Sequence, residues 1–134
     1  FITLTGSTNE VSIKVDMPIQ FAMALSDENV TDLAASTSVP VWTKRSALDF
    51  TLTDAIFDVV TAPTGATIVI DIHNNGSSVF SAQPTIASAG FISTGATIGA
   101  ATFNVGDKIE IFIDQIGSSV AGKGLKGDII GVLR

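Results

Sequence analysis

The chain has 134 residues, 46% of them hydrophobic, a net charge of −6 and no cysteine. This length fits one domain with its own core, and the hydrophobic content excludes a disordered tail. The acidic balance argues against nucleic acid as a partner, the absence of cysteine excludes disulfides and thiol chemistry, and no run of 18 apolar residues predicts a membrane-spanning helix.

The N-terminal segment predicts a small unit of its own. Short strands are expected over residues 2–5 and 11–15, joined by a turn at residues 6–9, and Asp16-Met17-Pro18 indicates a break before the main body. We therefore expect residues 1–19 to form an N-terminal arm or β-hairpin, and residues 20–134 to form the main domain. Since the chain begins at Phe1 and not Met, a processed product or the ordered part of a longer chain is expected.

The next segments predict short strands and one short helix. Strands are expected over residues 21–25, 41–44, 50–53 and 56–61. Between the first two, residues 27–35 could form one or two helical turns with Ser26 as the cap, and Val30, Leu33 and Ala34 would give these turns an apolar side.

The clearest strand covers residues 67–73, where isoleucines at every second position alternate with polar residues. The isoleucine row is Ile68, Ile70 and Ile72. Asn74-Asn75-Gly76 follows at once, and an Asn-Gly pair supplies the positive φ angles that a tight hairpin requires. Residues 77–81 are therefore expected to return as the second strand of a hairpin.

The second half continues the same pattern. Strands are expected over residues 85–87, 97–103, 108–116 and 125–133, and a second isoleucine row falls at Ile109, Ile111 and Ile113. About ten short strands separated by turn residues, without the helices of a parallel sheet, favour an all-β fold. We expect an antiparallel β-sandwich, jelly-roll-like in arrangement.

Few side chains are suited to catalysis or metal binding. His73 is the only histidine, so multi-histidine metal sites and most catalytic triads are excluded, and a hydrogen-bonded or exposed histidine is expected. Asp71 and Asp114 lie on the polar faces of two strong strands. They would share a row if these strands are neighbours, as solvated charges or as a carboxylate pair for sugar hydrolysis or a calcium ion. We expect no catalytic residue, no metal and no cofactor, because no accompanying motif supports these sites.

Two apolar residues point to a contact surface. Val69 and Phe112 alternate onto the faces opposite the isoleucine rows, where polar residues are expected. Isolated exposed apolar residues are ordinary, but a cluster of them indicates a surface that another subunit covers. We take Val69 and Phe112 as candidate interface residues. Gly122-Lys123-Gly124 lacks the spacing of a phosphate-binding loop and is interpreted as a turn.

From about residue 21 to its end, the chain resembles a domain that recurs in virion structural proteins of tailed bacteriophages. Two features are most typical: an Ile-Asp-Ile strand before an Asn-Gly turn, and an Asp-Gln-Ile-Gly strand near the end. The matching segments are residues 21–28, 50–53, 61–67, 70–76 (Ile-Asp-Ile-His-Asn-Asn-Gly), 113–118 (Ile-Asp-Gln-Ile-Gly-Ser) and 121–126. Residues 88–101 contain more Gly and Ala than this pattern.

The resemblance implies a phage structural protein located in the virion: a capsid decoration (cement) protein or a head or tail fibre domain. Its partners would be major capsid or tail proteins and further copies of itself, with a trimer as one arrangement. The alternative is an adhesion module at a fibre tip that binds host surface glycans through loops such as 74–76 and 117–124. A glycoside-cleaving enzyme that uses Asp71 and Asp114 is a third, weaker hypothesis.

Overall fold

The computed structural model describes residues 2–7, 10–28, 30–35, 37–99 and 101–134, and within them it contains strands and no helix. The strands are β1 (Ile2–Ser7), β2 (Glu10–Val15), β3 (Met17–Ala24), β4 (Thr37–Thr43), β5 (Phe50–Asp58), β6 (Ile68–Asn74), β7 (Ser77–Ser78), β8 (Phe80–Ala82), β9 (Thr85–Ile86), β10 (Thr97–Ile98), β11 (Thr102–Phe103), β12 (Lys108–Gln115) and β13 (Lys126–Leu133). The described part of the chain holds no helix with the length and apolarity to cross a membrane.

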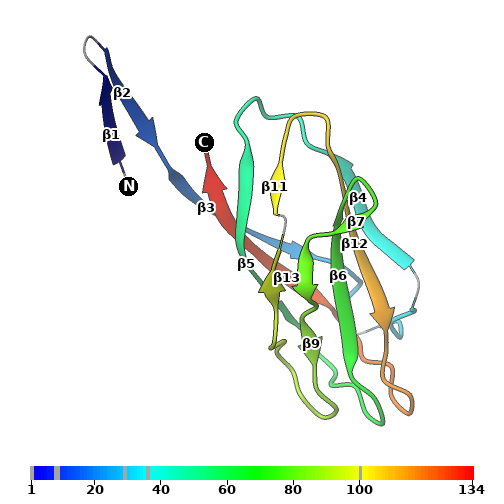
Figure 1. The fold of residues 1–134 in the computed structure, drawn as a ribbon. Coiled ribbons are helices and arrows are strands. Elements are labelled where there is room, and N and C mark those ends of the chain that lie inside the picture. Colours follow the sequence, from blue (N-terminus) through cyan, green and yellow to red (C-terminus); the bar gives the residue numbers. More distant parts are fainter. Residues whose placement is uncertain (1, 8–9, 29, 36, 100) are drawn as a thin grey trace.

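Two antiparallel sheets form the body of the molecule (Figure 1). One has the order β11-β5-β13-β3 and the other β4-β12-β6-β7, with β9 also paired to β6. Buried side chains from both sheets join in one hydrophobic core, which contains Phe57 and Phe103 from the first sheet and Ile70 and Ile111 from the second. The predicted all-β antiparallel sandwich is confirmed.

Both predicted isoleucine rows face this core. Ile70 of β6 pairs with Ile113 of β12, and Ile72 pairs with Ile111, so the two rows lie side by side in neighbouring strands. All six isoleucines are buried. The period-two pattern was a sufficient signal because one face of each strand is covered by the opposite sheet.

The two strands predicted over residues 50–53 and 56–61 are a single strand, β5. The pairing with β13 shifts between Ile130, opposite Asp54, and Gly131, opposite Leu52. Thr53 is thus the extra residue of a β-bulge, and the alternation of buried residues restarts after it. The bulge explains why the sequence pattern looked interrupted although the strand continues.

One further expectation about strands is wrong. The strand expected over residues 97–103 is two short strands, β10 and β11, which pair with β8 and β5; residue 100 lies outside the described residues. The break expected at Asp16-Met17-Pro18 is confined to Asp16, because β2 ends at Val15 and β3, which belongs to another sheet, begins at Met17 and includes Pro18. β3 is an edge strand, and proline is tolerated there because one side of the strand has no partner.

The helix expected over residues 27–35 is also wrong. Asp27 accepts hydrogen bonds from the backbone N–H (3.0 Å) and the hydroxyl (2.6 Å) of Thr31, which close a local turn. Ser26 does not cap a helix, because its hydroxyl accepts the Leu125 N–H at 2.8 Å. Leu33 is buried in the core. A turn closed by the Asp27 carboxylate therefore replaces the helical conformation, and the segment packs against the loop before β13.

The predicted Asn-Gly turn is confirmed, but its return strand is shorter than the expected residues 77–81: only Ser77–Ser78 pair with β6, and Phe80–Ala82 form β8, which pairs with β10. β6 and β7 are joined by Asn75 and Gly76, which have φ values of 50° and 85°. Asp107, in the turn before β12, holds this hairpin to the neighbouring turn. Its carboxylate accepts hydrogen bonds from the Asn104 backbone N–H (2.7 Å), the Asn75 side chain (2.8 Å) and the Asn74 side chain (3.3 Å).

These hydrogen bonds, led by the one from the Asn104 backbone, hold the pKa of Asp107 below its ordinary value of 3.8. Because the folded-state pKa is lowered, the stabilisation is present above pH 3.8 and is lost as the pH falls through the folded-state value. We expect Asp107→Asn to lower Tm at pH 7, and the difference from wild type to shrink below pH 3.8. Thermal melts from pH 7 to about pH 2.5 would check this; a constant difference would contradict it.

Two glycines of β13 allow side chains of β5 to lie close to the β13 backbone. Gly127 pairs with Phe57 of β5, and a Cβ atom there would lie 2.9 Å from the Phe57 ring. A Cβ at Gly131 would overlap both the Phe50 ring and the backbone oxygen of Thr51. Absence of side chains on this face of β13 lets aromatic rings of β5 lie against the backbone.

β1 and β2 form a separate two-stranded sheet that extends away from the sandwich (Figure 1). Their register pairs Ile2 with Val15 and Leu4 with Ile13. β3 continues from this hairpin into the sandwich, where its pairing with β13 starts at Met17. The expected division of the chain at residue 19 stays a prediction.

Candidate functional site

The sequence-predicted residues Asp71, His73 and Asp114 meet in one polar cluster on the outer face of the second sheet. β6 and β12 are neighbours, and His73 Nε2 lies 3.1 Å from Asp71 Oδ2. The Gln83 amide nitrogen donates to Asp71 (2.8 Å) and to Asp114 (2.6 Å), so it bridges the two carboxylates. Ser78 Oγ donates to the other oxygen of Asp71 at 2.7 Å.

The expectation that both carboxylates are solvated charges is wrong for Asp71. It is 3% exposed, although it lies on the face opposite the isoleucine row, whereas Asp114 is exposed. Ser78, His73 and Gln83 cover Asp71 and satisfy its oxygens, as a buried carboxylate requires. Sequence reasoning missed Gln83, because its link to Asp71 depends on the path of the chain after β8.

The order of contacts in this cluster does not match nucleophilic catalysis. In a serine triad, histidine lies between the serine and the acid. Here the Asp71 carboxylate is the central group and receives both Ser78 and His73. The Gln83 amide also lies between the two carboxylates, where hydrolysis of a sugar would need the glycosidic oxygen or water. Among the described residues, no group of three or more acidic or histidine side chains is placed to hold a metal ion.

The candidate interface residues Val69 and Phe112 lie beside this cluster. The register pairs Phe112 with Asp71, and Val69 precedes Asp71 by two residues, so all three share the outer face. Both apolar residues are half-buried. The Phe112 ring is tilted against the His73 imidazole with 4.5 Å between ring centres, and it therefore covers part of the polar cluster from the side.

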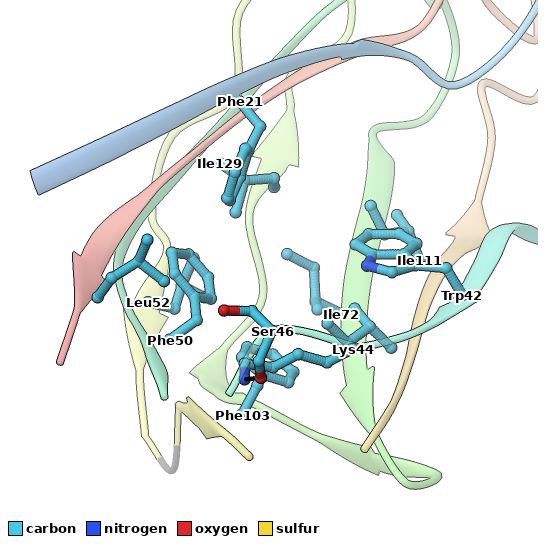
Figure 2. Close-up of a pocket in the computed structure, with 12 residues that line it drawn as sticks. Phe21, Trp42, Lys44, Ser46, Phe50, Leu52, Ile72, Phe103, Ile111 and Ile129 are labelled. Carbon is cyan, nitrogen blue, oxygen red and sulfur yellow. Dashed lines mark hydrogen bonds between the residues drawn. The ribbon is translucent and has the colours of Figure 1, made fainter. Parts of the chain in front are cut away.

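A second feature, which sequence reasoning missed, is an apolar cleft between the two sheets (Figure 2). It has a volume of about 120 Å³. Phe50 and Leu52 of β5 form one side, and Trp42 of β4 and Ile111 of β12 the other. Lys44 also lines the cleft and is 7% exposed. One signal was available, because Trp42 and Lys44 are two positions apart and so share one side of an extended chain.

Exposed apolar side chains continue along the edge of the first sheet. On β3, Met17 is 44% and Phe21 38% exposed, and Val15 at the end of β2 is 48% exposed. Phe21 also lines the cleft, and its ring lies 5.4 Å from that of Phe50. The edge of β3 that faces away from β13 has no partner strand among the described residues. We call this edge, together with the hairpin of β1 and β2 that precedes it in the chain, the arm surface.

Comparison of the chain with models of known protein families, and with curated proteins, finds no match. The resemblance to phage virion domains therefore stays a prediction.

Proposed function

We propose that this chain is a structural component of a bacteriophage particle, of the capsid-decoration or fibre class, that works by packing and assembly. The observation that carries the proposal is the arm surface: a hairpin outside the sandwich, continued by an unpaired strand edge with exposed apolar residues. Two-stranded hairpins are marginally stable alone in water, so a projecting one is suited to pairing with another surface.

The arm surface offers two kinds of contact at once. An unpaired strand edge presents backbone N–H and C=O groups that a strand of another chain can pair with. Apolar side chains beside that edge, such as Met17 and Phe21, would lose water contact in the same event. Partners are further copies of this chain or the shell and tail proteins of the particle, and the place of action is the virion.

The hairpin offers a matched test. Its backbone register pairs Leu4 with Ile13 and Thr5 with Ser12, which gives one apolar and one polar pair of neighbouring positions. We expect purified particles to contain this protein in stoichiometric amounts by mass spectrometry. Particles assembled with the Leu4→Asp/Ile13→Asp variant should retain at least tenfold less of it, because charges in place of two apolar residues oppose burial.

The Thr5→Asp/Ser12→Asp variant places the same charges at two polar positions of the hairpin and should be retained as well as wild type. Circular dichroism would establish that all three proteins keep their strand content. Absence of the wild-type protein from purified particles would overturn the proposal. Equal retention of both double variants would contradict the role of the apolar pair.

A further inference from the structure

A buried lysine lines the cleft between the two sheets. Lys44 follows β4 and is 7% exposed. In the described part of the chain, its Nζ donates to the Ser46 backbone oxygen at 2.7 Å. Among the described residues, no carboxylate lies within 4.0 Å of this nitrogen. An ammonium has three N–H donors, so Lys44 keeps donor capacity for an anionic group.

The space beside this ammonium is apolar. Figure 2 shows an open region between the side chains of Phe50 and Leu52 on one side and Trp42 on the other, with Lys44 along its lower boundary. Its volume is about 120 Å³. A dry apolar cavity of about 150 Å³ is known to hold benzene, and this cleft is somewhat smaller, so it has room for the end of a short alkyl chain.

We propose that the cleft binds a small amphiphilic carboxylate, with the carboxylate on the Lys44 ammonium and its apolar body between the two sheets. Phe21 lines both this cleft and the arm surface, but binding of the carboxylate requires no role in a particle.

Both halves of the ligand are required by the chemistry of the site. A buried ammonium is unfavourable without an anionic partner, and a carboxylate would supply one together with a charge-assisted hydrogen bond. A small inorganic anion gains too little, because it has no apolar part to place against the apolar walls of the cleft. An apolar tail supplies the remaining affinity, because it moves out of water into contact with the apolar walls of the cleft.

The chain carries its own reporter for this site. Trp42 is the only tryptophan and lines the cleft, so its fluorescence reports on the cleft alone. The probes are octanoate, 1-octanol, octylammonium and acetate, titrated into the wild-type chain. We expect octanoate to shift the Trp42 emission saturably, with a Kd at least tenfold lower than that of 1-octanol. Octylammonium and acetate should cause no saturable change.

Lys44→Met removes the charge and keeps a long apolar side chain. This variant should bind octanoate no more tightly than 1-octanol, a loss of at least tenfold, while its affinity for 1-octanol stays within threefold of wild type. The matched control is Lys126→Met, which removes a more exposed lysine outside the cleft and should leave both affinities unchanged.

Equal affinity of the wild-type chain for octanoate and 1-octanol would overturn the proposal. So would a Lys44→Met variant that is folded and keeps the preference for octanoate. If that variant fails to fold, the comparison of the four probes on the wild-type chain decides alone: selective saturation by octanoate supports the site, and its absence overturns it.

Discussion

Replacing Gly131 with alanine is expected to lower the free energy of unfolding by about 3 kcal/mol, at the upper end of the cost of overpacking. The added Cβ would overlap the Phe50 ring and the backbone oxygen of Thr51. A side chain can move away, but the Thr51 oxygen belongs to β5, which pairs with β13. Urea denaturation followed by circular dichroism would measure the loss.

Gly127 is the matched control for Gly131, because it lies four residues earlier in the same strand. Its added Cβ would meet only side-chain atoms of Phe57 and Leu25, at 2.9 to 3.2 Å. We expect Gly127→Ala to cost about 1 kcal/mol. Adding Phe50→Leu to Gly131→Ala should not restore stability, since the clash with the Thr51 oxygen remains. Equal costs for the two glycines would contradict this interpretation.

Asp71→Ala is expected to cost about 3 kcal/mol, because truncation removes a buried carboxylate together with its hydrogen bonds to half-buried and exposed side chains. Ser78, His73 and Gln83 all direct polar atoms at this carboxylate, which is 3% exposed. The control is Asp114→Ala: this carboxylate is exposed and receives one hydrogen bond from Gln83, so the expected cost is below about 0.5 kcal/mol.

Thermal and urea unfolding of the two aspartate variants would check the contrast. A cost at Asp114 as large as that at Asp71 would show that the bridge through Gln83, and not burial, determines the stability of the cluster. The Asp71 variant also tests whether the cluster is structural: a folded Asp71→Ala protein with unchanged stability would contradict that role.

The sequence predicted the fold class because the strongest signals were local. The isoleucine rows of β6 and β12 and the Asn75-Gly76 turn follow from alternation and from positive φ angles, which need no knowledge of distant contacts. The interruption at Thr53 was misinterpreted, since a bulge and a loop both break a period-two pattern. The helix over residues 27–35 was wrong because its turn is fixed by Asp27 and by docking to the segment before β13.

Both parts of the candidate site were harder to predict. Asp71 lies at an alternation position typical of solvent, and its burial depends on Gln83, twelve residues later. The burial of Lys44 is set by residues from both sheets that line the cleft and lie far from it in the sequence. Contacts between residues that are far apart in the sequence bury these two side chains, and a single sequence does not reveal which distant residues will be in contact.

The position of β13 has a consequence for how the molecule is made. It lies between β3 and β5 and follows both in the sequence, so the first sheet cannot close while residues 126–133 are still missing from a growing polypeptide. Until then, β3 and β5 have open edges toward each other and Phe57 lacks the backbone that it covers. The first sheet therefore forms only after residues 126–133 have been synthesised, and before that the nascent chain exposes strand edges that can pair with other chains.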